Sequence, residues 1–296
     1  MVRITADFQQ ERVLHPAAIP LLSEFFTKGW ADPNKLNNSS RQTAILLQQV
    51  RQTFANALNV RPDEIEFLGE VDLGFQLGIA GLLKPESKLY YSKIDRQKVY
   101  AVAANEQNLG RSTTCLSVNG DGEIADFTCD TNDVICWQVA NGESGNLQKV
   151  LKNQALTFAD CTASGVDHLP QFDYQTALFD SSSWQGPAGF GVLVIRSAEK
   201  WRNPLPHNDL SRTPGTFSIP LALASSVALE NYLKEGDIRS KLKQEIIAFI
   251  KSEITDVDIA STADGLAKFI SFSIKGIEAD RALLVVEELG FAVDSG

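Results

Sequence analysis

The sequence predicts an α/β protein with a mainly parallel sheet between helices, followed by a smaller α+β unit. Apolar segments of strand length alternate with helical patterns between residues 60 and 200. Several of these segments contain continuous apolar runs, such as VICW within 133–140 (DVICWQVA), which is typical of parallel strands buried on both faces. From about residue 216 the pattern changes to two long helices, an alternating segment and a last helix.

The elements are expected in the following order. Two amphipathic helices open the chain at 17–30 and 39–60, the second with Ser39 or Ser40 as its N-cap. Apolar runs predict strands, and 3.6-residue spacing predicts helices between them. The expected strands are 64–68, 88–92, 113–118, 133–140, 155–160, 174–179, 190–196 and 266–274, and the further helices are 74–83, 98–108, 217–236, 237–254 and 278–290.

These elements predict an N-terminal segment over 1–15, a large α/β domain over 16–235 and a partial small domain over 236–296. Ligands of such sheets bind beyond the carboxyl ends of the strands. Polar residues that directly follow a strand are therefore the candidate site. They are Gly69–Asp72, Ser92–Arg96, Asn141–Glu143, Asp160–Ala163 and Asp180–Ser183.

The amino-acid composition disfavours nucleic acid and membranes as partners. Lys and Arg total 27 against 37 Asp and Glu, a formal charge of −10, whereas nucleic-acid binding requires a basic surface. No apolar run approaches the ~20 residues of a membrane span, and the first residues lack the apolar core of a signal peptide. We expect a cytoplasmic protein with neither nucleic acid nor membrane as a partner.

The chain has four cysteines and three histidines. No two cysteines form a C-x-x-C pair and the histidines lie far from them in sequence, so no metal site is expected and free buried thiols are. Cys161, at a strand end, stays open as a reactive thiol if a cation or helix N-terminus lies beside it. The full set is Cys115, Cys129, Cys136, Cys161, His15, His168 and His207.

Seven stretches, taken in order, resemble the cysteine desulfurases of the class V aminotransferase family. The resemblance implies the fold-type I architecture of enzymes that use pyridoxal phosphate (PLP), a homodimer, and a partner in sulfur or iron–sulfur metabolism. "VANGESGNLQ" is similar to the family's V-N-N-E-x-G-x-x-Q, and "LFDSSSWQGPAGFGVLVIR" to F-S-G-H-K-x-Y-G-P-x-G-x-G-x-L. The matching stretches are 15–26, 61–82, 139–148, 156–164, 178–196, 212–224 and 290–296.

The resemblance places Ser183 at the lysine that carries PLP and Ser182 at the histidine before it. There is no lysine between Lys152 and Lys200. A serine hydroxyl cannot form the imine that holds PLP. The chain therefore lacks the anchor of the family's cofactor.

Other positions implied by the resemblance have changed as well. Asp72, with Glu70 nearby, stands at the threonine that binds the PLP phosphate, where one like-charge contact at ~4 Å costs about 4 kcal/mol. The remaining positions are Arg96 for the ring-stacking histidine, Gly142 for an asparagine, Ala163 for a glutamine, Asp160 for the acid on the pyridine nitrogen, and Arg212 and Thr216 for the segment that reaches the neighbouring subunit's phosphate.

The sequence thus predicts a catalytically inactive desulfurase-like protein, a pseudoenzyme that binds no PLP and acts by binding or dimerisation. Asp160 is expected to bond to solvent, to Ser182 or to Ser183, or to cap the next segment, with Arg96 neutralising the local acids. Trp184 is expected to fill volume that a cofactor would occupy.

Three alternatives stay open. The first is an active PLP-dependent desulfurase or lyase using a displaced lysine such as Lys93. The second is a small-molecule or metal sensor that uses Glu70, Asp72 and Asp160. The third is a serine nucleophile among Ser181, Ser182 and Ser183, for which His168 and His207 are the available bases.

Overall fold

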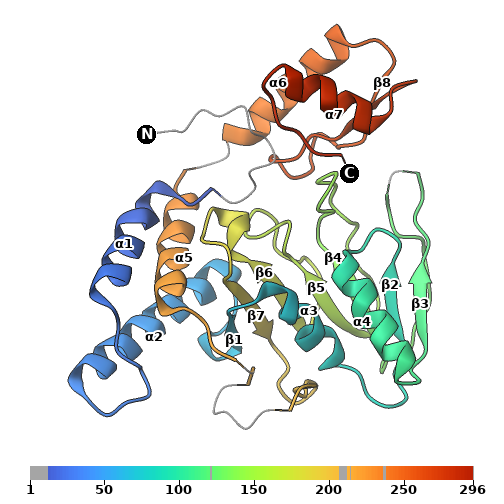
Figure 1. Ribbon diagram of the computed structural model, residues 1–296. Coiled ribbons are helices and arrows are strands. Elements are labelled where there is room, and N and C mark those ends of the chain that lie inside the picture. The colour runs from blue at the N-terminus through green and yellow to red at the C-terminus, as the bar shows by residue number, and fades with distance from the viewer. Residues whose placement is uncertain (1–12, 121, 207–211, 214, 236–237, 296) are drawn as a thin grey trace.

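The computed structural model describes residues 13–120, 122–206, 212, 213, 215–235 and 238–295. Its main body is a seven-stranded sheet with helices on both faces (Figure 1). A second, two-stranded sheet lies with the last helices at the C-terminal end of the chain. The predicted fold class is confirmed, while the domain boundaries at 15 and 235 stay predictions.

The strands are β1 (Ile65–Leu68), β2 (Leu89–Ser92), β3 (Thr113–Leu116), β4 (Val134–Gln138), β5 (Leu156–Asp160), β6 (Thr176–Asp180), β7 (Gly191–Ile195), β8 (Val257–Ile259) and β9 (Phe272–Ile274). The helices are α1 (Ile19–Lys28), α2 (Asn38–Leu58), α3 (Val71–Ala80), α4 (Gln97–Asn108), α5 (Ile219–Tyr232), α6 (Ile238–Glu253) and α7 (Ala279–Glu288). Three short 3-10 helices are η1 (Pro16–Ala18), η2 (Pro62–Glu64) and η3 (Ser181–Trp184).

The large sheet has the order β1-β7-β6-β5-β4-β2-β3. β7 runs antiparallel to both of its neighbours, and the other pairs are parallel. The link between β6 and β7 spans only residues 181–190 and holds η3, which is too short for the crossover that a parallel neighbour requires. Because β1 and β6 both oppose β7, the carboxyl ends of all the strands except β7 share one edge.

α2 begins one position earlier than the sequence pattern indicated. Its N-cap is Asn37, whose side chain accepts a hydrogen bond from the Ser40 backbone N–H at 2.9 Å. Ser39 and Ser40 are inside the helix, so the prediction that either of them caps it is wrong. Asn37 is as good a cap as serine, and the pattern of small polar residues did not distinguish them.

The C-terminal unit also differs in detail. β8 was missed because it is three residues long and carries a charged residue, Asp258, at its centre. The strand expected over 266–274 is reduced to β9, because residues 260–271 form a loop that docks on the main body. β8 and β9 pair antiparallel, with Asp258 opposite Ser273.

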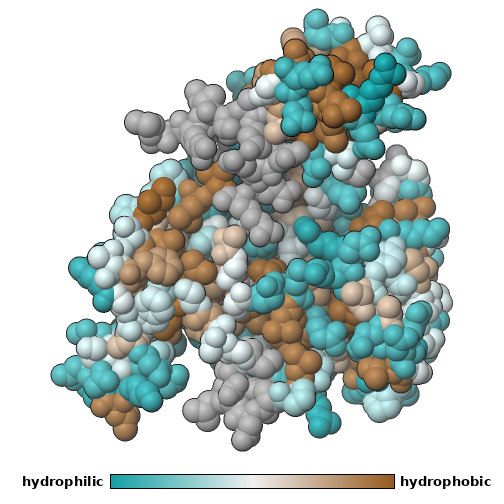
Figure 2. Space-filling view, in the orientation of Figure 1, coloured by the Kyte–Doolittle hydropathy of each residue, from teal (hydrophilic) through white to brown (hydrophobic). Residues whose placement is uncertain are grey.

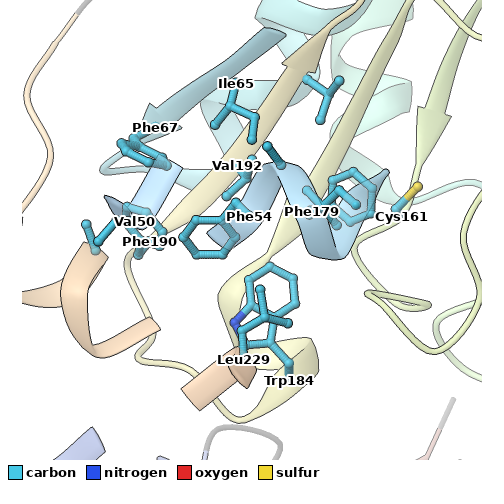
Figure 3. Close-up of a cluster of buried hydrophobic side chains, with 14 of the residues drawn as sticks. Val50, Phe54, Ile65, Phe67, Cys161, Phe179, Trp184, Phe190, Val192 and Leu229 are labelled. Atoms are coloured by element: carbon cyan, nitrogen blue, oxygen red, sulfur yellow. The ribbon is translucent and has the colours of Figure 1, made fainter. Parts of the chain in front are cut away.

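Two apolar clusters lie on the two faces of the large sheet. One packs the sheet against α2 and α5 around Phe54, whose ring lies 5.8 Å from that of Trp184 and 5.8 Å from that of Phe67 (Figure 3). The other packs the sheet against α3 and α4 around Phe75 and Phe158, with ring centroids 5.8 Å apart. With helices on both faces, as predicted, β1, β4, β5 and β7 are buried along their whole length, whereas the edge strand β3 is largely not.

Large apolar side chains remain exposed on the C-terminal unit, where Figure 2 shows brown surface over α6 and α7. On α6 they follow helical spacing along one side, at Leu242, Ile246 and Phe249, and on α7 they include Leu284 and Val285. No helix in the described part of the chain is long and apolar enough to cross a membrane.

Gly78 tests how closely α3 sits on the sheet. A Cβ there would lie 2.5 Å from the buried ring of Phe158. We expect Gly78→Ala to lower the free energy of unfolding by roughly 2 kcal/mol, because overpacking of ~3 kcal/mol outweighs a helix-propensity gain of ~1 kcal/mol. Urea denaturation measures the change. Gly120→Ala is the control, since a Cβ at Gly120 would meet nothing within 4 Å; equal midpoints for the two variants would contradict this packing.

Candidate functional site

Some of the residues predicted at the strand ends, namely Arg96, Gly142 and Asp160, come together at the carboxyl edge of the sheet. Arg96, after β2, lies beside Asp160 at the end of β5, with Nε 3.7 Å from Oδ2. Gly165, beyond β5, contacts Ser183, since a Cβ on Gly165 would lie 2.2 Å from the Ser183 Oγ. The arrangement expected from the topology of a parallel sheet is therefore present in this structure.

The three serines of η3 have structural hydrogen bonds. Asp180 caps η3, its carboxylate accepting from the Ser182 N–H at 2.9 Å. The Ser183 hydroxyl donates to the backbone carbonyl of Asp180 at 2.7 Å, and the Ser181 hydroxyl bonds to that of Ser225 at 2.6 Å. No base contacts any of these hydroxyls in the described chain, and His207 lies outside it. A serine nucleophile needs a base in contact with its hydroxyl, so this geometry does not support one among Ser181, Ser182 and Ser183.

Trp184 lies in the core and not at the site. Its side chain is fully buried, packs on Phe54, and donates its indole N–H to the Ser225 hydroxyl at 3.1 Å (Figure 3). The expectation that Trp184 fills a cofactor's volume is wrong. η3 turns this side chain under the sheet toward α2 and α5, a direction that sequence alone did not indicate.

Asp160 is buried and has partners for both carboxylate oxygens. Oδ1 accepts from the backbone N–H of Thr162 at 2.9 Å and from its hydroxyl at 2.6 Å. Oδ2 faces the Arg96 guanidinium. Asp160 thus caps the following segment, as one of the expectations had it, and no bond joins it to Ser182 or Ser183.

Gly142 lies directly beneath Arg96. A Cβ on Gly142 would be 2.8 Å from Nη2 and 3.3 Å from Cζ of the guanidinium. The guanidinium therefore occupies the space that any larger residue at position 142 would require. The Arg96 guanidinium thus packs against Gly142 in space that a side chain at position 142 would take.

Asp95 lies within the predicted range Ser92–Arg96, but the sequence analysis gave it no role of its own. Its carboxylate is buried and accepts from the Ser92 N–H at 2.6 Å and from the Gln138 side-chain amide at 3.0 Å. The pKa of Asp95 is raised to about 7, mainly because the carboxyl is buried; the bonds from Ser92 and Gln138 oppose this rise, and the charge of Asp160 adds to it. The one sequence signal was an Asp placed three residues after a strand's last residue, a spacing that suits a turn.

The acidic residues near the N-terminus of α3 have separate roles. Glu70 is the N-cap, and its carboxylate accepts from the Asp72 N–H at 3.2 Å. Asp72 pairs with Lys98 of α4, Nζ to Oδ2 2.8 Å. The positive charge of Lys98 offsets the charge of Asp72. The repulsion that Asp72 would exert on an anion at this helix end is therefore smaller than the sequence predicted. The stronger obstacle is Glu70, which already occupies the helix N-terminus as an anion.

Ala163 faces the C-terminal unit. It forms a small apolar cluster with Ala140 and the fully buried Leu266. The Leu266 N–H donates to the Gly145 carbonyl at 2.8 Å, which fixes the docking loop on the loop after β4. A glutamine in place of Ala163 would need the space that Leu266 fills.

Arg212 and Thr216 engage their own chain. Arg212 pairs with Glu66 of β1, Nε to Oε1 3.1 Å. The Thr216 carbonyl packs on Gly69 so closely that a Cβ there would lie 2.5 Å away. The resemblance placed Arg212 in the segment that reaches the neighbouring subunit's phosphate. In this structure its guanidinium is paired with the Glu66 carboxylate of the same chain.

The cysteines do not all match the buried thiols that were expected. Cys136 and Cys161 are buried and Cys129 is half-buried, but Cys115 is exposed. Burial raises the pKa values of the Cys136 and Cys161 thiols well above their ordinary range. Because the thiolate is the nucleophile, this environment opposes a reactive Cys161. Within the described residues, no three or more His, Cys, Asp or Glu side chains gather as a metal site.

Among the described residues, Lys243 of α6 is a lysine whose side chain is buried. It is 1% exposed and donates to the Leu266 carbonyl at 3.0 Å. Burial lowers the pKa of Lys243, and the nearby charge of Asp264 raises it in part. Lys93, considered from the sequence, is exposed. Lys243 was missed because an amphipathic helix pattern does not reveal a lysine that turns inward.

Asp95 predicts a pH effect on stability. The folded chain holds a proton on Asp95 between about pH 4 and its raised pKa near 7, where the unfolded chain has lost it. The free energy of unfolding therefore falls as pH rises through that window. We expect Asp95→Asn to remove this fall, so that its stability relative to wild type is about 1–3 kcal/mol greater at pH ~8 than at pH ~5.

Urea denaturation at both pH values measures the difference. Asp126→Asn, at a fully exposed side chain, is the control and should change little between them. A pH-independent difference between Asp95→Asn and wild type would contradict a protonated, buried Asp95.

Comparison with known proteins connects this geometry to a family. No family model matches the sequence. A cysteine desulfurase IscS of Clostridium botulinum is 23% identical over 322 residues, covering 99% of this chain and 81% of that relative. The resemblance to cysteine desulfurases seen in the sequence motifs is thus confirmed over nearly the whole of this chain.

Solved structures agree. A NifS-like protein superposes with a TM-score of 0.88 at 17% identity, covering 99% of this chain and 88% of that one. A NifS-like protein from Rickettsia africae gives a TM-score of 0.82 at 19% identity, covering 100% of this chain and 88% of that one. The chain has the fold of these NifS-like proteins, with its mostly parallel seven-stranded sheet.

Proposed function

We propose that this chain, built on the cysteine desulfurase fold, is a pseudoenzyme that binds no PLP and acts through binding. The observation that carries the proposal is Ser183. It stands where the resemblance implies the PLP lysine, and its hydroxyl is engaged with the Asp180 carbonyl at 2.7 Å. A hydroxyl cannot replace the amine that forms the imine.

The two ends of the expected cofactor site support the same proposal. At the phosphate end, the N-terminus of α3 is capped by the Glu70 carboxylate, which competes with any other anion for those N–H groups. At the ring end, Asp160 would hold a pyridine nitrogen, but its oxygens are engaged by Thr162 and Arg96. The residues present do not fit PLP.

A homodimer and a partner in sulfur or iron–sulfur metabolism remain part of the proposal by analogy with the family. A cytoplasmic location rests on sequence composition. The sensor alternative keeps only its small-molecule form, because Glu70, Asp72 and Asp160 each have another partner and do not form one cluster.

Addition of PLP tests the proposal directly. We expect no saturable imine absorbance and, after borohydride reduction and proteolysis, no pyridoxyl-modified lysine by mass spectrometry. The C. botulinum desulfurase serves as the positive control. A reduced adduct on any lysine at stoichiometric yield would contradict the proposal and identify the anchoring residue.

Lys243 is the reason for keeping a second candidate, an active PLP-dependent desulfurase or lyase with a displaced lysine. A buried lysine with a lowered pKa is the type of residue that Schiff-base chemistry uses. Its hydrogen-bond acceptor, Leu266, packs on Ala163 at the carboxyl edge of the sheet.

Release of alanine and sulfide from cysteine, with PLP present, distinguishes the two candidates. We expect neither product from wild type. Production by wild type that is lost in Lys243→Ala and retained in Lys241→Ala would favour the second candidate; Lys241 lies on the same helix with its side chain 83% exposed.

A further inference from the structure

The ion pair of Arg96 and Asp160 joins a half-exposed guanidinium to a carboxylate whose side chain is 7% exposed. A buried carboxylate is stable only with a cation or several donors beside it. Thr162 supplies two donors to Oδ1, and Arg96 supplies the planar cation beside Oδ2. Both hydrogen bonds from Thr162 go to Oδ1, and the Arg96 guanidinium, 3.7 Å from Oδ2, is the cation that offsets the buried charge.

We infer that Arg96 is the internal occupant of the site, its guanidinium held at Asp160 in the place of a bound planar cation such as a protonated pyridine ring. The inference rests on the proposed absence of PLP. It gives a second reason for that absence, at Asp160, which does not depend on Ser183. It assigns two residues to one function: Arg96 fills the site, and Gly142 leaves the room for it.

The backbone before Arg96 is fixed, which directs its side chain. The Asp95 carboxylate accepts the Ser92 N–H, closing a turn at the end of β2. Gln138 donates to the Ile94 carbonyl at 3.0 Å and to Asp95 at 3.0 Å, so β4 holds the same turn from the side. Arg96 then begins α4 as its N-cap residue. Its guanidinium thereby reaches past the end of β4, which lies between β2 and β5, to Asp160 at the end of β5.

Gly142 makes the arrangement specific. A Cβ at this position would approach the guanidinium to 2.8 Å at Nη2. The backbone of Gly142 does not have the positive φ that only glycine adopts easily, so an added methyl group acts mainly through this contact. Gly142→Ala should therefore push Arg96 away from Asp160 and leave the carboxylate without its cation.

The first test is a thermal-denaturation cycle without any ligand. We expect Gly142→Ala to lower the melting temperature by about 2–4 °C in wild type, and by less than half as much in the Arg96→Gln background. Gly120→Ala, at an open position, should have the same small effect in both backgrounds. Equal losses for Gly142→Ala in the two backgrounds would overturn the inference.

The second test adds PLP to Ser183→Lys and to Ser183→Lys combined with Arg96→His. Borohydride reduction and mass spectrometry measure the pyridoxyl adduct at position 183. We expect at least tenfold more adduct in the double variant, because only there is Asp160 released. Equal yields, including none in either variant, would overturn the role of Arg96. If Ser183→Lys does not fold, the denaturation cycle alone decides.

The two proposals fail separately. An adduct on wild-type chain would refute the absence of PLP while leaving the coupling between Gly142 and Arg96 intact. Loss of that coupling would refute the internal occupant while leaving wild type free of PLP.

Discussion

The carboxylate of Asp160, at the end of the central strand β5, is the constraint on which the site depends. A charge buried among strand ends is unfavourable unless donors and a cation surround it. The segment after β5 supplies the donors of Thr162, the turn after β2 supplies Arg96, and the loop after β4 provides Gly142, which leaves space for the guanidinium. The carboxyl edge of the sheet is thus filled by the chain's own groups, each satisfied by a neighbour.

Much of the fold was readable because its signals are local. Continuous apolar runs gave β4 to β7, and regular helical spacing gave α2 and α5. The direction of β7 was contained in the short link before it, which cannot cross over the sheet. The absence of a lysine near Ser183 is a property of the sequence and does not depend on the fold. The presence of β8, the reduction of the strand expected over 266–274 to β9 and the N-cap of α2 depended on differences too small for these patterns to show.

The parts of the site that sequence did not give are those decided by burial. Asp95 and Lys243 look like ordinary surface residues in their own segments, and only packing of distant segments removes them from water. Trp184 points into the core because η3 turns it there. Lys98 changes the effect of Asp72 because α3 and α4 lie side by side. In each case the deciding contact joins residues far apart in the chain, and no local pattern carries that information.

The docking loop 260–271 determines how the C-terminal unit can move. Asn146 donates to the Ala260 carbonyl at 2.8 Å and accepts from the Thr262 N–H at 2.7 Å, while the Ser261 hydroxyl donates to the Ser144 carbonyl at 2.6 Å. Swinging this unit away from the sheet would break these bonds together and expose Leu266 to water. Any displacement of the C-terminal unit from the loop after β4 therefore carries the cost of losing these bonds and the apolar contact of Leu266 with Ala140 and Ala163.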